Sequence, residues 1–563
     1  MNRLNLTRKK IVLLCIFLII FTVGTVLILI VPIGVKSSYG LTVNTLDGEK
    51  ISFNVFEPKR GGINKKAVIL GHGIMSNKEM LKGFALELAT AGFVAVPLDF
   101  RGHGQSSGII DRIGLINDIN AIINYLSARG DIDMNSLGYF GFSMGGGPGL
   151  QIVNESTDFK CFIGAGTWLP TNVRKGNSTN PLNILMILGQ YDELIEPEDL
   201  KVGLSDYTGI PIADLDVNKL YGSFQDGNAS MIYLDDNSNH VLGDWDPDFI
   251  RETRNFVMNT FPEVRPIDEN FFANIRLVIL FLQILAGISL FLILVDPISK
   301  LLVKPQENEV FKLELEESSI KNLSIKIFGY PILLGLIGIL IFVPIILILY
   351  LATAGFILAL LFGQAFGYLI LLWRLGKKKN ITMRSILKSP FHIQRNSLIR
   401  QFILGIVLAI IITVIIYLSG GLNYMGMIPS LIKIPWMFLV IPITFIIFMI
   451  FSLVLQGVFH NKFESGTKRF IKVSMINFAF LFSYMFFYLL IIALIMNSFF
   501  YFGSFLPFAI PLFILMSVFA THVYQKSGNI IAGSIVNTLF FTMLICTISP
   551  YQSGLSFILG FFY

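Results

Sequence analysis

The chain has 563 residues, of which 54% are hydrophobic and only 14% are charged. Soluble globular proteins carry about 25% charged residues, so this composition excludes a wholly soluble protein. The net charge of +6 is uneven, because residues 35–270 hold 19 basic and 30 acidic side chains whereas the rest holds 24 and 7. The basic excess lies between apolar runs, where it is a topology signal and predicts no nucleic-acid partner.

The first apolar run covers residues 11–35 and follows four basic residues, Arg3, Arg8, Lys9 and Lys10. Cleaved signal peptides have an apolar core of only about 7–15 residues before a small-residue cleavage site. This run is longer and ends without such a site. Residues 1–35 are therefore predicted to form an uncleaved signal-anchor transmembrane helix.

Residues 36–270 are predicted to form one folded domain outside the membrane. Seven short β-rich runs alternate with helical stretches at 78–91, 113–129 and 247–259; the runs are 51–56, 67–70, 93–98, 136–142, 161–165, 184–188 and 231–234. Alternation of strand and helix indicates an α/β fold with a doubly wound, mostly parallel sheet.

Residues 271–563 are predicted to form an all-α polytopic membrane domain. Eight apolar runs are long enough to cross a bilayer core of about 30 Å; they lie near 275–295, 328–350, 353–374, 401–419, 434–457, 472–496, 504–522 and 529–549. With the first run, the chain would cross the membrane nine times.

The loops between these runs differ in charge. The 375–400 loop and its edge hold eight basic residues and no acid, and the 459–471 loop adds Lys462, Lys468 and Arg469, whereas the loops assigned to the other side contain Lys433 alone. Basic loops tend to remain cytoplasmic. The pattern predicts a cytoplasmic N-terminus and places residues 36–270 on the extracytoplasmic side.

The strongest local motif is Gly141-Phe142-Ser143-Met144-Gly145, which follows an apolar strand and precedes a small-residue helix start. A nucleophilic serine in a strained strand-to-helix turn needs small neighbours, because the two backbones pack closely around it. Ser143 is therefore the candidate nucleophile. The alternative is a purely structural glycine-rich turn.

A second motif, His72-Gly73-Ile74, follows the apolar run 67–70. Such a loop can direct a backbone N–H at a substrate carbonyl oxygen, and the amide that follows the nucleophile supplies a second donor. By position, Ile74 and Met144 are the candidate oxyanion-hole residues. His72 itself is expected to order the loop.

The general base is chosen among the three histidines of residues 36–270, His72, His103 and His240. His103 comes too early in the chain, whereas His240 follows the last predicted strand. That position agrees with the chain order nucleophile, acid, histidine. His240 would take the proton of Ser143 and return it to the leaving group.

The acid is predicted to be Asp192, which follows the penultimate strand in Gly189-Gln190-Tyr191-Asp192. Its carboxylate would orient the imidazole of the base and stabilise its charged form. Glu193, Glu196 and Asp236 are rival candidates. No Cys/His group has zinc-ligand spacing, and the three cysteines lie far apart, so we expect neither metal nor cofactor.

Residues 40–260 resemble the α/β-hydrolase superfamily, especially its esterase and monoacylglycerol-lipase-like branches. The resemblance rests on His72-Gly73, on the sequence from Asp99 to Ser106, on the Gly141–Gly145 motif, on Gly189–Asp192 and on Asn239-His240. It implies a serine hydrolase with a Ser143, Asp192 and His240 triad. It does not specify a substrate, and the C-terminal runs resemble no family.

Two departures from that family concern access to the site. Only about 18 residues separate the strands ending near 165 and beginning near 184, which leaves room for a minimal cap and predicts an open site. The segment 199–230 is longer than the simple fold needs. It is interpreted as a small lid or membrane-facing flap, with a plain surface excursion as the alternative.

Two classes of function remain open. The first is an acyl-ester hydrolase acting through an acyl-enzyme, with lipid or lipid-linked esters as substrates and the membrane as partner; an acyltransferase or peptidase would use the same residues. The second is a receptor, transporter or assembly protein that uses the fold as a binding module. Eight C-terminal spans exceed what an anchor needs, so that part is expected to bind a lipid or a protein partner.

Overall fold

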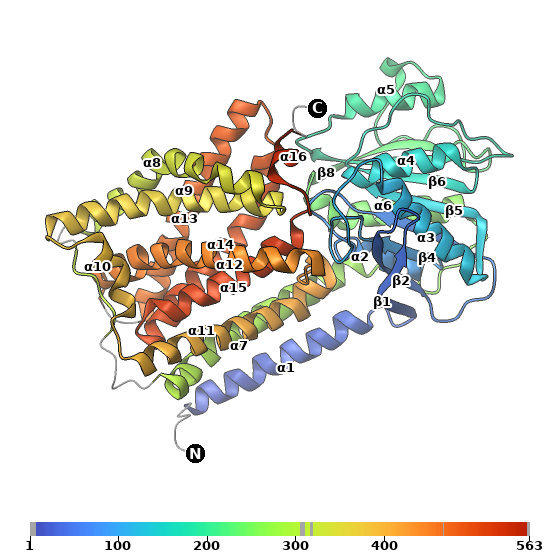
Figure 1. Ribbon diagram of the computed structural model, residues 1–563. Coiled ribbons are helices and arrows are strands. Elements are labelled where there is room, and N and C mark those ends of the chain that lie inside the picture. The colour runs from blue at the N-terminus through green and yellow to red at the C-terminus, as the bar shows by residue number, and fades with distance from the viewer. Residues whose placement is uncertain (1–6, 304–309, 316–318, 465–466, 560–563) are drawn as a thin grey trace.

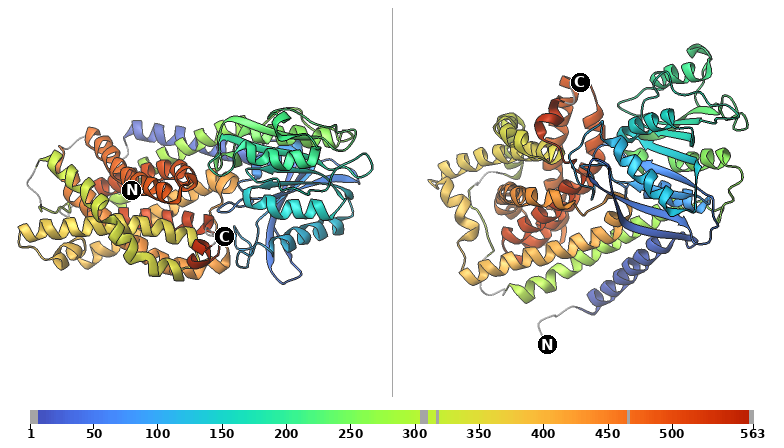
Figure 2. Two further views of the ribbon diagram at one scale, coloured as in Figure 1. Left: turned by 90° about the horizontal axis from the view of Figure 1, so that it is seen from above. Right: turned by 45° about the vertical axis from the view of Figure 1, so that its right-hand side comes forward.

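The computed structural model describes residues 7–303, 310–315, 319–464 and 467–559. It places them in two parts that lie side by side, an α/β domain and a helical bundle (Figure 1). Both views of Figure 2 keep the two parts adjacent, with the long helices of the bundle running towards the α/β domain.

The α/β domain is built on one eight-stranded sheet with the order β1-β2-β4-β3-β5-β6-β7-β8. The strands are β1 (Val35–Asn44), β2 (Lys50–Pro58), β3 (Lys65–Gly71), β4 (Val94–Leu98), β5 (Ile132–Phe142), β6 (Phe159–Ala165), β7 (Asn183–Tyr191) and β8 (Ser230–Asn239). The first two strands join by antiparallel pairing, and the other six pair in parallel. The predicted mostly parallel sheet is confirmed; β1 was not predicted.

Helices cover both faces of this sheet, which explains why the central strands are apolar along their whole length. One face carries α2 (Lys82–Thr90) and α6 (Pro247–Thr260), and the other carries α3 (Leu115–Arg129) and α4 (Gly146–Glu155). Helix α5 (Pro197–Thr208) packs beside β8. It lies in the segment that was interpreted as a lid.

The helical bundle begins with α1 and continues from α7 to the C-terminal side of the chain. Its helices are α1 (Arg8–Ile30), α7 (Ala273–Leu302), α8 (Ile320–Ile348), α9 (Ala352–Lys378), α10 (Met383–Lys388), α11 (Arg395–Ile416), α12 (Ile434–Ser452), α13 (Thr467–Met496), α14 (Phe500–Ser527), α15 (Ile530–Ile548) and α16 (Gly554–Leu559). A π-helical segment, η5 (Tyr417–Met425), extends α11. Within the described residues, nine helical spans are long and apolar enough to cross a membrane, as predicted.

The N-terminal helix packs within the bundle, and its role as a signal anchor stays a prediction. Its Thr25 hydroxyl accepts a hydrogen bond from Gln283 of α7 at 2.8 Å, and its Ile28 carbonyl accepts one from Arg276 at 2.8 Å. Figure 1 shows α10 at the end of the bundle farthest from the α/β domain. The basic 375–400 loop and the sheet therefore lie at opposite ends of the spans.

Three side chains of the α/β domain donate hydrogen bonds to η5. Asn77 reaches the Met425 carbonyl at 2.7 Å, Lys82 reaches Asn423 Oδ1 at 2.7 Å, and the Trp245 indole reaches the Tyr424 carbonyl at 2.8 Å. These residues follow the carboxyl ends of β3 and β8. The edge of the sheet where parallel α/β folds place their ligands thus faces the bundle.

Candidate active site

Ser143 lies at the sharp turn between β5 and α4. Its φ of +47° is a left-handed value that side-chain-bearing residues rarely adopt. A Cβ atom on Gly145 would lie 2.4 Å from the Gly71 carbonyl oxygen, and one on Gly141 would lie 2.7 Å from the Gly145 carbonyl oxygen. The strand–turn–helix arrangement predicted around this serine is present, and it leaves no space for side chains at either glycine.

His240 connects Ser143 to Asp192 through two hydrogen bonds. Its Nε2 lies 2.9 Å from Ser143 Oγ, and its Nδ1 lies 2.8 Å from Asp192 Oδ2. Asp192 follows β7 and His240 follows the neighbouring β8, so sheet register brings the two together. The His240 side chain is 4% exposed and the Asp192 side chain is 1% exposed. The three residues singled out from the sequence therefore form one hydrogen-bonded chain.

The rival acid Glu193 has a different place in this arrangement. Its carboxylate accepts hydrogen bonds from the Asn239 amide side chain at 3.0 Å and from the His240 backbone N–H at 3.3 Å. Burial raises the pKa of Glu193 above its usual range. Glu193 thus holds the loop that carries the histidine, a positioning role that the sequence did not reveal. Glu196 belongs to the capping box of α5, and Asp236 is exposed.

His72 and His103 are both buried away from the serine. His72 Nε2 accepts the Phe100 backbone N–H at 3.0 Å, and its Nδ1 lies 2.7 Å from the Gly73 carbonyl oxygen. Burial lowers the pKa of His72 to about 4 and that of His103 well below its usual value. Neutral His72 therefore bridges the loops after β3 and β4, as the sequence predicted.

A pocket with an empty volume of about 420 Å³ opens beside Ser143. Ile74 lines it, together with Gly73, Met75, Ser76, Met80, Phe142, His240, Val241, Asp244, Trp245, Phe500 and Phe508. Met144 directly follows the serine, and its side chain packs on the domain core. The hydrogen-bond donor roles of Ile74 and Met144 stay predictions.

The bundle covers this pocket, so the expectation of an open site is wrong. The Phe500 ring of α14 meets the His240 ring edge-on at 5.6 Å between centroids, and Phe508 meets Trp245 at 5.7 Å. The segment 199–230 supplies none of the described lining residues. Its α5 packs on the domain core beside β8, at the top of the α/β domain in Figure 1, so the lid interpretation is wrong and the segment is a surface excursion.

One acidic side chain in the pocket was not predicted. Asp244 accepts a hydrogen bond from the Ser76 hydroxyl at 3.1 Å through Oδ2, and its Oδ1 has no partner in the described part of the chain. Burial raises the pKa of Asp244 to about 7. The sequence places this residue in an ordinary Gly-Asp turn, and only the fold brings it beside the serine.

Residues 62–198 match the family model described as serine aminopeptidase, S33. The matched region contains the loop after β3, the serine turn and Asp192. This domain has the α/β-hydrolase fold. The remaining helices are a separate, all-helical region with nine spans apolar enough for a membrane among the described residues.

Several known proteins are similar to the α/β-hydrolase domain. An uncharacterized 31.7 kDa protein of Escherichia coli, from the traX-finO intergenic region, is 31% identical over 121 residues, which are 21% of this chain and 41% of that protein. The chain thus matches about two-fifths of the length of that relative. The alpha/beta hydrolase domain-containing protein WAV2 of Arabidopsis thaliana is 38% identical over 61 residues, 11% of this chain and 20% of that protein.

Solved structures are similar at lower identity. The esterase Pf2001 of Pyrococcus furiosus has a TM-score of 0.31 and 17% identity, over 39% of this chain and 90% of that one. A predicted CIB-like hydrolase of Thermoplasma acidophilum has a TM-score of 0.31 and 19% identity, over 40% and 100% of the respective chains.

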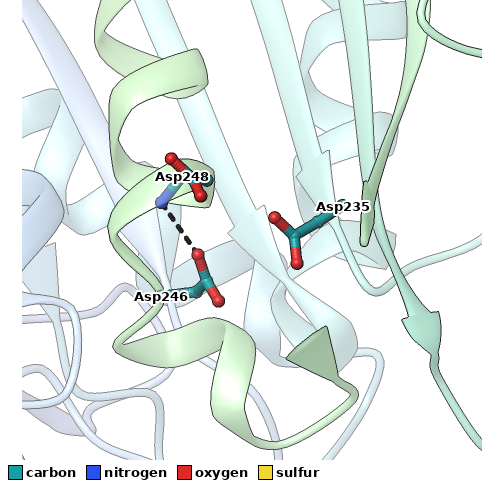
Figure 3. A group of neighbouring side chains, drawn as sticks. All are labelled: Asp235, Asp246 and Asp248. Carbon is teal, nitrogen blue, oxygen red and sulfur yellow. Dashed lines mark hydrogen bonds between the residues drawn. The ribbon is translucent and has the colours of Figure 1, made fainter. Parts of the chain in front are cut away.

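Three carboxylates near the histidine loop lie within 4.8 Å of one another, those of Asp235, Asp246 and Asp248 (Figure 3). Local hydrogen bonds account for two of them. Asp246 caps α6 by accepting the Asp248 N–H at 2.8 Å, and Asp235 accepts the N–H groups of Asn237 and Ser238 at 3.0 and 2.9 Å. These bonds hold the end of β8 and the start of α6, and we assign the group no cation.

The close approach at the serine turn can be tested with two glycines of the same turn. Gly145→Ala should lower the thermal midpoint by about 2–10 °C and suppress activity, because the new methyl group must displace the Gly71 carbonyl. Gly147→Ala is the matched control, since no atom of the described residues lies within 4 Å of a Cβ there. Equal thermal midpoints and equal activities for the two variants would contradict the close backbone packing at the serine turn.

Proposed function

We propose that this protein is a membrane-bound serine hydrolase that cleaves acyl esters, of lipids or lipid-linked groups, through an acyl-enzyme on Ser143. The observation that carries the proposal is the chain of hydrogen bonds from Ser143 through His240 to Asp192, at 2.9 and 2.8 Å. A pure binding module has no use for a strained serine joined to a buried His–Asp pair.

In the proposed reaction, Ser143 Oγ attacks the ester carbonyl carbon while His240 Nε2 takes the hydroxyl proton. Asp192 holds the imidazole by its Nδ1–H and stabilises the positive charge that develops. The carbonyl electron pair moves to oxygen, which would accept hydrogen bonds from the backbone N–H groups of Ile74 and Met144. When this intermediate collapses, the C–O bond to the alcohol breaks and the leaving oxygen takes the proton from His240. Water then attacks the acyl-enzyme by the same steps and releases the acid.

The walls of the pocket favour an acyl group over a peptide. Four of the lining side chains are Met75, Met80, Phe500 and Phe508, which offer no partner to a peptide backbone. Asp244, the one acidic side chain among the described lining residues, favours the second candidate, an aminopeptidase, because a free amine could pair with its oxygen that has no described partner. Burial keeps much of this carboxyl protonated near neutral pH, which weakens that candidate.

The test is hydrolysis by the full-length protein in lipid vesicles. Release of fatty acid and of nitrophenol from nitrophenyl esters should exceed release of nitroaniline from aminoacyl nitroanilides. Ser143→Ala should lower ester hydrolysis at least about 10³-fold while the protein stays folded. Preference for the nitroanilide would favour the aminopeptidase, and full ester activity in Ser143→Ala would reject both.

We further propose that the N-terminus is cytoplasmic and the hydrolase domain extracytoplasmic. This orientation is supported by the position of the basic 375–400 loop, which lies at the end of the bundle remote from the sheet. Basic loops tend to remain on the cytoplasmic side. The acidic charge of residues 35–270 places no obstacle to export.

Orientation can be measured with single cysteines in a Cys15→Ser background. A cysteine replacing exposed Glu155 of α4 should react with an impermeant maleimide in intact cells, whereas one replacing exposed Lys378 should react only after permeabilisation. Buried Cys161 and Cys546 should stay silent. The reverse order of reactivity would invert the proposed topology.

A further inference from the structure

A second, larger cavity lies where the hydrolase domain meets the bundle. The space in it that no atom fills, part of which is open to solvent, is about 790 Å³. Among the described residues, its wall is apolar except for Ser504; the other lining residues are Met75, Met80, Ile357, Leu360, Met425, Met485, Phe505, Phe508, Ala509, Leu512, Phe513, Phe541, Leu544, Ile545 and Ile548. Four helices of the bundle, α9, α13, α14 and α15, supply most of this wall.

The cavity is elongated along two helices. Its α14 residues run from Ser504 to Phe513 and recur at helical spacing, so they form one face of the helix. At about 1.5 Å per residue, that face extends roughly 13 Å. On α15 the lining residues from Phe541 to Ile548 form a second wall of the same kind. The space is therefore a slot that follows the spans into the bundle.

The slot adjoins the pocket of Ser143. Met75, Met80 and Phe508 line both spaces. Met75 and Met80 belong to the loop after β3, directly beside the serine, and Phe508 belongs to α14. Methionine side chains are unbranched and adaptable, so they can shift to admit a slender apolar group. An acyl carbonyl at Ser143 would thus have a continuous apolar route for its chain.

We propose that this slot is the acyl-chain subsite of the enzyme, and that the bundle itself binds the hydrocarbon chain of the substrate. The inference rests on the proposed function and adds its substrate class: esters with a long, unbranched acyl chain. An apolar wall with a single hydroxyl has nothing to bind a charged headgroup or a peptide backbone. The headgroup and alcohol would remain on the side of Asp244 and Trp245.

This role gives the eight C-terminal spans a purpose beyond anchoring. In an isolated α/β-hydrolase domain, the loop after β3 would meet solvent at Met75 and Met80. Here α14 and α15 complete the pocket, and the chain length that fits would be set by how far the slot extends along α14. The full-length chain should consequently prefer long acyl chains over short ones.

A photocrosslinking probe tests the subsite on the unmodified, full-length protein. The probe is an alkyl fluorophosphonate with a diazirine at the end of a long chain. Ser143 Oγ displaces fluoride and forms a phosphonate ester; light then expels dinitrogen from the diazirine, and the carbene inserts into its nearest neighbour. Mass spectrometry should locate the crosslinks on α13, α14 or α15, for example at Met485, Phe513 or Leu544.

The outcomes distinguish the acyl-chain subsite from the hydrolase function of Ser143. Crosslinks confined to the hydrolase domain, or to lipid alone, would overturn the subsite while Ser143 labelling upheld the hydrolase. Failure of the probe to modify Ser143 would overturn the proposed function and the subsite with it.

A pair of substitutions on adjacent residues of α14 gives an independent test. Ala509 lines the slot, whereas Ile510 is 39% exposed on the outside of the helix. Ala509→Phe should lower the ratio of long-chain to short-chain nitrophenyl ester turnover at least tenfold, and Ile510→Phe should leave that ratio unchanged. An unchanged ratio in folded Ala509→Phe overturns the inference; if that variant does not fold, the crosslinks decide.

Discussion

Replacing His240 by alanine should lower kcat/KM for an ester substrate by about 10⁴-fold or more, the loss typical when a general base is removed from a serine hydrolase. The physical reason is that His240, at 2.9 Å, is the base that the described residues offer to the proton of Ser143 Oγ. Hydrolysis of nitrophenyl esters by the purified full-length variant measures the effect, with KM expected to change little.

The control for this prediction is His103→Ala. His103 is buried, and its Nδ1 lies 3.0 Å from the Arg101 carbonyl oxygen, in a turn that contacts the bundle rather than the serine. The His103→Ala substitution should lower the thermal midpoint of unfolding, because it removes a buried side chain. It should leave most of kcat in the folded protein. A His103→Ala variant that stays folded yet loses as much activity as His240→Ala would reopen the assignment of the base.

The second large effect concerns two neighbouring acids with different partners. Asp192→Asn should lower kcat by about 10³–10⁴-fold, because an amide facing His240 Nδ1 favours the wrong tautomer and cannot stabilise the imidazolium. Glu193→Gln keeps an acceptor for the Asn239 amide and the His240 N–H, so it should cost less than about tenfold, the equivalent of one weakened hydrogen bond.

Steady-state kinetics over a range of pH separates these roles. Asp192→Asn should lower kcat on the pH plateau by about 10³–10⁴-fold. Glu193→Gln should lower it there by less than about tenfold. Equal losses in the two variants, or a larger loss in Glu193→Gln, would transfer the role of the acid to Glu193.

The central chemistry was predictable because it depends on short-range patterns. The Gly141–Gly145 motif combines a strand end, a serine and two glycines, and each glycine is explained by a backbone approach of 2.7 Å or less for a Cβ atom. Asp192 and His240 could be chosen because parallel strands deliver their carboxyl ends to one edge. Continuous apolar strands likewise predicted a sheet covered on both faces.

The surroundings of the site could not be predicted, because they depend on contacts between residues far apart in the chain. Phe500 lies 260 positions after His240 and Phe508 lies 263 after Trp245, yet each pair is in ring contact. Loop charge places the start of α14 on the side of the hydrolase domain, but neither local pattern nor hydropathy states that its side chains contact the site. The open-site prediction failed for that reason, and the polar, exposed β1 escaped notice because alternation there is weak.

The segment 199–230 illustrates a different limit. Its apolar residues were interpreted as a small lid or membrane-facing flap, with a plain surface excursion as the alternative. Leu200, Leu204 and Tyr207 of α5 are buried in the core on one face of the sheet. Apolar composition alone could not indicate which surface these side chains would cover.

The most direct measurement of the central claim is the site of reaction with a fluorophosphonate in the full-length protein. Ser143 is the one serine that the structure joins to a buried His–Asp pair among the described residues. We expect a single modified peptide that carries Ser143, with labelling abolished in Ser143→Ala and strongly slowed in His240→Ala. Modification of a different serine, or labelling that survives in folded Ser143→Ala, would contradict the account.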